Sequence, residues 1–348
     1  MMFTIVYRVR RFRMDENIKK VLVVQLGAVG EVVLATPVIN ILRENYPHSQ
    51  IACLTTEAGT EVINNHPQLD QSLVLEQQRF KRLQAQSGRI AALKSVRPLI
   101  KQIKDENFAV VIDLTSTFVS ALITWLTRAQ QRVGFNVPLQ SLLYTKTVNA
   151  DSKIHIVEQY LQLLSSLEMD FAEQELEFRV AASQQDQDYI ERIFNKYNLH
   201  HQSNLVLFNL DTREESSWSA AKFIELGQWL QDQTTSRLVI VGSEDNKRQA
   251  EKINNQVRGQ VLNLTGEMTP GRLSELVSRV DLVVSAVSEV LYLAQIFAVA
   301  TIALFGSLDD QVYGPYQGDN IVINSSTDKV ADISVESVIN YVQLLTEQ

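Results

Sequence analysis

The stretch VLVVQLGAVGEVVLATP, residues 21–37, decides the fold class of this chain. It begins with an apolar run, passes through Gly27 and Gly30, and enters an amphipathic segment that opens with Glu31. Glycine lets a chain turn tightly and lets a ligand approach the backbone. A β-branched run followed by such a turn and a helix is the first half of a βαβ unit. The stretch therefore predicts a parallel sheet whose strands alternate with helices.

The same alternation continues through the first half of the chain. It becomes less regular between residues 136 and 183, where one helix is predicted at 155–167. The other predicted elements of this half are strands at 51–56, 72–76, 109–114 and 132–135, and helices at 31–45, 57–65, 89–104 and 117–128.

The pattern restarts in the second half, with predicted strands at 204–210, 237–242, 261–266, 281–286 and 301–306 and helices at 184–197, 219–233, 245–256, 270–278, 288–297 and 333–346.

At roughly 100–200 residues per domain, 348 residues fit two domains. We predict an α/β protein with two Rossmann-like domains facing a cleft, at 19–183 and 184–330. A poorly ordered basic extension (1–18) precedes them and a C-terminal helix (331–348) follows. Ligands of such sheets bind outside the carboxyl ends of the strands.

Composition excludes several classes of protein. A net charge of −8 argues against a nucleic-acid binder. The single cysteine, Cys53, cannot form an internal disulfide and fits a reducing compartment; within IACLTT it is predicted to be a small apolar strand residue. One cysteine and five scattered histidines offer no metal-ligand spacing. No apolar run at the N-terminus resembles a signal peptide or a membrane span, so we expect a cytoplasmic protein.

Residues 79–104 carry eight Lys and Arg side chains and no acid. One interpretation is a face that meets an anionic membrane or acceptor, which would place the protein at the inner membrane surface. The other is a solvated helical face. We slightly favour the second, because Leu and Ile recur at helical spacing in this segment.

Glu31 lies in the first turn of its predicted helix, where the helix dipole stabilises a negative charge. It can act there as a proton acceptor, or it can be only a favourable first-turn acid. The pattern GxxGE does not decide between these two interpretations.

Further segments together with residues 25–37 resemble glycosyltransferase family 9, the ADP-heptose:lipopolysaccharide heptosyltransferases. The resemblance implies an acceptor domain followed by a donor domain of the GT-B type. It implies an ADP-linked sugar as co-substrate, a lipopolysaccharide-core or related glycolipid acceptor, and no metal or other cofactor. Glu31 stands where the family has a catalytic aspartate base. The segments are FAVVIDLTSTFVSALI (108–123), RVGF (132–135), HIVEQYLQLL (155–164), SSWSAAKFIELGQWL (216–230) and LFGSLDDQVYGPY (304–316).

On the donor side the resemblance keeps some family residues and replaces others. Thr212, Arg213 and Ser288 are retained, Glu244 matches the acid that holds the ribose, and Met268 matches a residue that lines the base. Glu244 and Met268 are equally compatible with a helix N-terminal acid and an ordinary hydrophobic contact. The replacements are Ser216 for a lysine, Val287 for an aspartate, Glu289 for a glycine and Tyr292 for a histidine.

These replacements remove a cation and add a carboxylate where a departing diphosphate needs stabilisation. Two hypotheses follow. The first, which we favour, is a transferase with Glu31 as base, and with Arg213 and the helix N-terminus at Ser288 holding the phosphates. The alternative is a catalytically degraded homologue with a binding or structural role. An unrelated α/β binding protein or epimerase would not explain the segments 25–37, 108–123 and 155–164.

Overall fold

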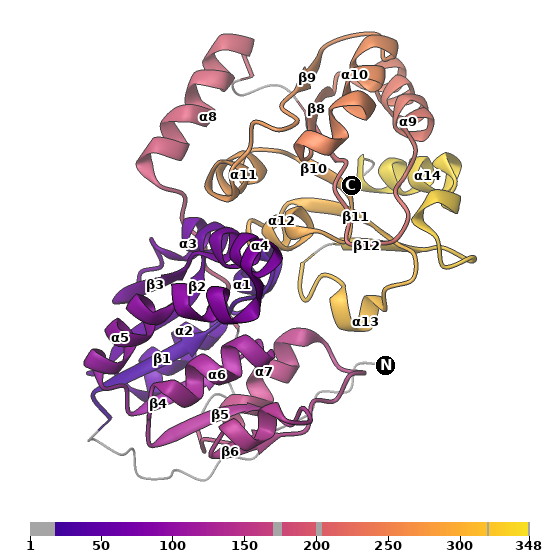
Figure 1. Cartoon of the computed structure of the whole chain (residues 1–348). Helices are drawn as coiled ribbons and strands as arrows, with labels where there is room; N and C mark the ends of the chain where they lie inside the picture. The colour runs from indigo at the N-terminus through magenta and orange to yellow at the C-terminus, as the bar shows by residue number, and fades with distance from the viewer. Residues whose placement is uncertain (1–17, 170–175, 200–203, 319, 347–348) are drawn as a thin grey trace. The chain divides into compact units, whose positions relative to one another are not determined.

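The computed structural model describes residues 18–169, 176–199, 204–318 and 320–346. The chain divides into two compact units (Figure 1). Unit 1 contains residues 1–152 and 156–180, and unit 2 contains residues 153–155 and 181–348. Each unit is built on a six-stranded parallel sheet with helices, which confirms the predicted pair of Rossmann-like α/β folds. Residues 1–17 of the predicted N-terminal extension lie outside the described residues.

The sheet of unit 1 has the order β3-β2-β1-β4-β5-β6. From β1 the chain builds outward to β3, and then returns to place β4 on the other side of β1. Val21 of β1 accordingly pairs with Ile51 on one side and with Val110 on the other. The carboxyl ends of β1 and β4 thus form the topological switch point of this sheet. The strands are β1 (Lys20–Val24), β2 (Gln50–Thr56), β3 (Gln71–Leu75), β4 (Val110–Asp113), β5 (Gln131–Phe135) and β6 (Lys146–Val148).

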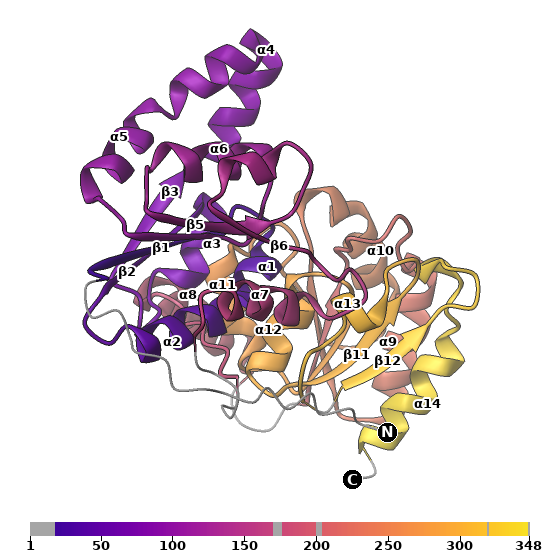
Figure 2. The same ribbon diagram turned by 90° about the horizontal axis from the view of Figure 1, so that it is seen from below.

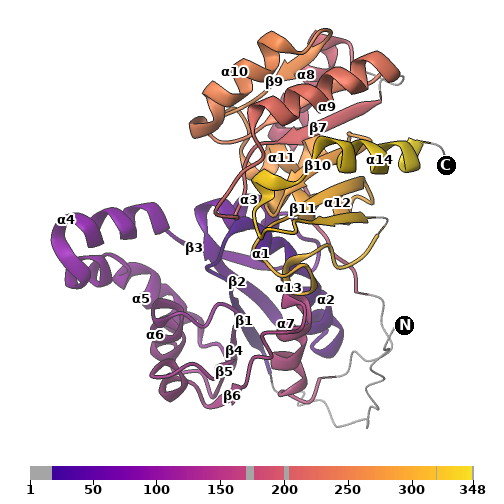
Figure 3. The same cartoon turned by 90° about the vertical axis from the view of Figure 1, so that its right-hand side faces the viewer.

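Helices cover both faces of this sheet, as Figure 3 shows. On one face lie α4 (Gln77–Ser95), α5 (Arg97–Glu106) and α6 (Phe118–Leu126), against which the 3-10 turn η1 (Gln140–Leu143) packs. The other face carries α1 (Val29–Leu34), α2 (Thr36–Asn45), α3 (Glu57–Ile63) and α7 (Ile156–Ser165). Cys53 is buried in β2 as predicted, and burial raises the pKa of its thiol to about 12.

The sheet of unit 2 has the order β12-β11-β10-β7-β8-β9, again parallel throughout. Leu282 of β10 pairs with Val206 of β7. Because the chain runs from β7 to β9 on one side and then crosses to β10 on the other, the switch point lies at the carboxyl ends of β7 and β10. The strands are β7 (Leu205–Asn209), β8 (Arg237–Val241), β9 (Val261–Asn263), β10 (Leu282–Ala286), β11 (Ala300–Phe305) and β12 (Asn320–Asn324).

The helices of unit 2 also form two groups. The helices α9 (Ala220–Gln233), α10 (Lys247–Gln256) and α14 (Val335–Thr346) enclose one apolar core with the sheet. The second group contains α8 (Gln184–Tyr197), α11 (Pro270–Val277) and α12 (Glu289–Ile296). Short turns complete the unit: η2 (Glu244–Asn246), α13 (Asp310–Tyr313) and η3 (Val330–Asp332).

The predicted bounds of two helices were wrong. The helix predicted at 31–45 is divided into α1 and α2, with Pro37 in the first turn of α2, where its missing N–H costs no hydrogen bond. The helix predicted at 89–104 is divided between α4 and α5, again with a proline, Pro98, in the first turn of the second helix. Gly88 has φ 82° and breaks α4 near its middle.

Candidate functional site

The glycine turn of unit 1 lies at the switch point. Gly30 is buried in α1, and Glu31 lies in the first turn of this helix. The Glu31 carboxylate folds back over the turn, so that a Cβ added to Gly27 would lie 1.8 Å from Glu31 Oε2. A side chain at position 27 is therefore incompatible with this carboxylate position. The structure brings Gly27, Gly30 and Glu31 together, at the place where open α/β sheets bind ligands.

A polar network that the sequence analysis did not identify supports this turn. Gln25 Oε1 accepts from Gly27 N and from Thr115 Oγ1, both at 3.0 Å, and Gln25 Nε2 donates to Tyr160 Oη at 2.9 Å. Thr115 Oγ1 in turn accepts from Leu26 N. The network joins the ends of β1 and β4. The sequence did contain a signal for this network, namely the position of Gln25 and Thr115 directly after apolar strands.

A second unpredicted group lies at the end of β4. Asp113 is fully buried and accepts from Thr115 N, Ser116 N and Tyr144 Oη. Burial raises the pKa of Asp113 to about 6, although these hydrogen bonds act in the opposite direction. An acid inside the apolar run VVID was the signal in the sequence.

In unit 2 four predicted donor-site residues lie at the switch point, in the loops after β7 and β10. Arg213 N donates to Val287 O at 2.8 Å, which joins the two loops, and the Arg213 guanidinium lies 5.8 Å from the centre of the Tyr313 ring. Thr212 Oγ1 accepts from Glu214 N. The buried Ser288 hydroxyl bonds to Asn209 and Ser285 in the interior, so it does not cap α12. Ser288 can therefore meet a phosphate only through its backbone.

Glu289 occupies the first turn of α12, half-buried. Burial raises the pKa of its carboxyl group, and the nearby Asp211 raises it further, whereas the Glu289 backbone N–H and Arg213 lower it. The N-terminus of α12 is thus already next to a carboxylate of its own chain, at the position where a helix end would attract an anionic ligand.

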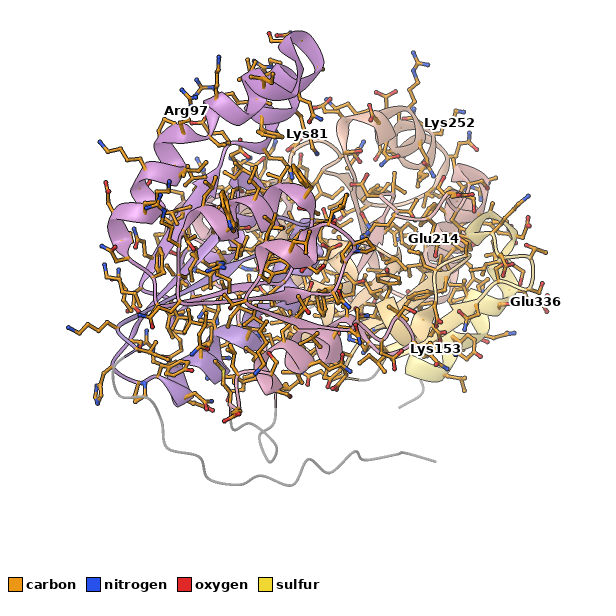
Figure 4. The ribbon with its side chains drawn as sticks, turned by 60° about the horizontal axis from the view of Figure 1, so that its bottom comes forward. Lys81, Arg97, Lys153, Glu214, Lys252 and Glu336 are labelled. Atoms are coloured by element: carbon orange, nitrogen blue, oxygen red, sulfur yellow. The ribbon has the colours of Figure 1, made fainter. Side chains whose placement is uncertain are left out.

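Glu214 follows Arg213 in the donor loop, but its charge is satisfied within unit 2. Its buried carboxylate accepts from the consecutive amides of Gly306, Ser307 and Leu308, and from Ser307 Oγ, at 3.0–3.4 Å. These donors satisfy the charge, so Glu214 connects the loops after β7 and β11. Glu214 is labelled in Figure 4.

Ser216 and Tyr292 are also engaged within unit 2. Ser216 Oγ accepts from Ala331 N at 3.4 Å, next to carbonyls that Lys222 Nζ contacts. The Tyr292 ring is fully buried, and its hydroxyl donates to Tyr313 O at 3.0 Å. The structure therefore places Tyr292 in the interior, where it holds α13.

Glu244 lies after β8, and Met268 lies between β9 and α11, so neither belongs to the loops at the switch point. Glu244 pairs with Lys247 at 2.6 Å, and a Cβ on Gly266 would lie 2.7 Å from Glu244 Oε1. Met268 is half-buried just before α11. Glu244 is the first residue of η2, which precedes α10, and its carboxylate is exposed, so both predicted roles stay open.

Within the described ranges, no three His, Cys, Asp or Glu side chains are arranged to hold a metal ion. Across the same residues, no helix has both the length and the apolar character needed to cross a bilayer.

Comparison with known proteins decides the family. Residues 96–342 match Glycosyltransferase family 9 (heptosyltransferase). The chain belongs to this family. One curated relative is the lipopolysaccharide core heptosyltransferase OpsX of Haemophilus influenzae, 21% identical over 312 residues, which span 87% of this chain and 84% of OpsX. The lipopolysaccharide heptosyltransferase 3 of Escherichia coli is 26% identical over 142 residues, 40% of this chain and 39% of that protein.

Solved structures agree on the fold of this family 9 chain. The crystal structure of a family 9 glycosyl transferase from Veillonella parvula has a TM-score of 0.85 at 21% identity, covering 96% of this chain and 99% of that one. The E. coli heptosyltransferase WaaC with ADP has a TM-score of 0.75 at 17% identity, covering 93% and 99%. These likenesses establish the GT-B-type fold. The comparisons do not favour a degraded homologue or an unrelated α/β protein.

Proposed function

We propose that the chain transfers a sugar, a heptose or one like it, from an ADP-linked donor to the lipopolysaccharide core or a related glycan. One observation carries the proposal: in a family 9 chain, the predicted base and the predicted phosphate-holding residues each lie at the switch point of a parallel sheet. Residues 19–183 would bind the acceptor, and residues 184–330 the donor. The reaction would take place in the cytoplasm at the inner membrane surface, and the partner would be a glycolipid and not a nucleic acid.

The proposed chemistry uses Glu31 as general base. Glu31 accepts the proton of an acceptor hydroxyl while the oxygen of that hydroxyl forms a bond to the anomeric carbon of the donor sugar. The bond between that carbon and the diphosphate oxygen breaks, and ADP leaves with the electron pair. Arg213 and the backbone N–H groups at the start of α12 would stabilise the departing charge. Gly27 leaves space for the Glu31 carboxylate above the turn.

Two measurements test this function. Isothermal titration with ADP and ADP-heptose measures donor binding, and release of ADP in the presence of acceptor measures turnover. Glu31→Gln should retain donor binding and lose turnover by roughly 100-fold or more, as expected for loss of a general base. The exposed Glu44→Gln in α2 is the matched control and should behave like the native chain. No donor binding at millimolar ligand, or full turnover by Glu31→Gln, would refute the proposal.

A further inference from the structure

One face of unit 1 concentrates apolar surface. Nine large hydrophobic side chains of the described chain are exposed, and five of them lie in α4, in α6, in the η1 turn and at Leu139, the residue just before η1. These elements lie on the same side of the sheet, and α4 projects from it in Figures 2 and 3. The five are Ile90, Phe118, Trp125, Leu139 and Leu142.

The centre of this face is α6. Phe118, Leu122 and Trp125 share one side of the helix at spacings of four and three residues, and Phe118 and Trp125 are 56% and 48% exposed. The η1 turn packs beside α6 and adds Leu139 and Leu142, which are 76% and 81% exposed. An amphipathic helix normally turns such a side toward the core. Here it faces outward, which marks an interaction site.

Leu139 strengthens this interpretation through its backbone. Its φ is 71° and its ψ is −45°, close to the classic γ-turn conformation, which is rare and strained. Glycine would suit this conformation better, and a leucine that is 76% exposed gains little from packing. The chain thus retains a strained residue that presents apolar surface to the outside. Strain of this kind concentrates at functional positions.

Cations lie on α5, which contacts α6, and on α4, which contacts α5. Between Gln77 and Lys104 the chain has no acid, although its net charge is −8. Five cations on α4 and α5 are exposed and form no ion pair with any described residue; Lys81 and Arg97 are labelled in Figure 4. The five are Lys81, Arg82, Lys94, Arg97 and Lys101.

The predicted alternative, a merely solvated helical face, accounts for part of this segment. Phe80, Ala92, Val96 and Ile103 are buried against the sheet, which explains the helical spacing of the apolar residues. It does not account for the outward Ile90 or for the apolar side of α6.

We propose that this face, formed by the cations of α4 and α5 and the apolar surface of α6 and η1, docks the protein on an anionic lipid bilayer. Exposed apolar side chains insert at the headgroup boundary, and the flanking cations pair with anionic headgroups. Trp125 suits this boundary, because its indole has an apolar body and a polar N–H. A protein partner would have to supply an acidic surface next to an apolar one, whereas an anionic membrane offers both everywhere. This inference deepens the proposed function and rests on it in one respect: the bilayer would be the one that holds the glycolipid acceptor.

Vesicle flotation of the full chain tests the proposal, with phosphatidylcholine alone or mixed with phosphatidylglycerol, at low and high salt. The native chain should float with the anionic vesicles at low salt. One variant removes apolar surface. A second removes four cations and should lose affinity by about fivefold per cation at low salt. The variants are Trp125→Ser/Leu139→Asn/Leu142→Gln and Arg82→Gln/Lys94→Gln/Arg97→Gln/Lys101→Gln.

The matched control removes four exposed cations of unit 2 and should float like the native chain. Equal flotation of all variants, or none by the native chain, would overturn the proposal. Self-association of the native chain that the apolar variant abolishes, with no vesicle binding, would assign the face to a second copy instead. Sugar transfer to a water-soluble acceptor fragment separates membrane docking from the proposed transferase activity. A variant that loses docking should still catalyse this transfer at the native rate. The control is Arg248→Gln/Lys252→Gln/Arg258→Gln/Lys329→Gln.

Discussion

Replacing Glu289 by glutamine should strengthen the binding of ADP. The change removes a carboxylate from the first turn of α12, at the switch point of unit 2, and nearly preserves side-chain volume. Two unit charges about 4 Å apart repel by about 4 kcal/mol at an effective dielectric constant of about 20. Because Glu289 is only half-buried and Arg213 offsets part of its charge, we expect about 1–2 kcal/mol. That corresponds to a roughly 5- to 30-fold lower Kd for ADP.

The pH dependence provides an independent check. The pKa of Glu289 is raised by burial, so its charge is lost progressively as the pH falls through that raised pKa. The affinity advantage of Glu289→Gln over the native chain should therefore be largest near neutral pH and shrink in acid. Taking the ratio of the two affinities cancels the titration of ADP itself. Glu336→Gln, in the first turn of α14, is the control. Equal ADP affinity of the native chain and Glu289→Gln across this range would refute the electrostatic reasoning.

Three further predictions concern turnover and stability. Gly27→Ala should lower turnover by roughly 100-fold with little change in melting temperature, because its Cβ would displace the Glu31 carboxylate; unchanged kcat would contradict the assigned base position. Asp113 has a pKa of about 6, raised above its unfolded value, so the stability that it contributes is full below about pH 4 and disappears as the pH rises through 6. Relative to Asp113→Asn, urea denaturation should show the native chain losing about 3 kcal/mol over that window. Glu214→Ala should cost about 3 kcal/mol and lower the melting temperature by several degrees, since the amides of 306–308 lose their acceptor, while the exposed Glu215→Ala should not.

The fold could be predicted because its signals are local and repeated. Each buried parallel strand is a short β-branched run, and each helix between strands has its own amphipathic period. The helix predicted at 184–197 has these bounds in the structure. What could not be predicted depends on neighbours distant in sequence. The edge strands β6 and β12 were missed, since their apolar runs are shorter than that of a central strand: β6 reads KTV and β12 reads NIVIN.

The candidate site was predictable in position but not in side-chain direction. Residues after parallel strands gather at one edge of the sheet, so Gly27, Glu31, Arg213 and Ser288 could be placed from the sequence. The direction of Glu214 could not, because its hydrogen-bond donors at 306–308 lie more than ninety residues further along the chain. The direction of the Tyr292 side chain likewise depends on a distant residue, because its hydroxyl donates to the carbonyl of Tyr313.

These directions change the electrostatic question that the sequence raised. Of the three glutamates near the donor loops, Glu214 has its charge satisfied by backbone amides, and Glu215 is exposed and screened by solvent. Glu289 alone is half-buried at a helix N-terminus of the switch point. Ser216, at the position where the family resemblance predicts a lysine, is a separate case, because its hydroxyl accepts a hydrogen bond from Ala331 N. The affinity for a diphosphate should therefore respond far more to one substitution at position 289 than to changes at 214 or 215.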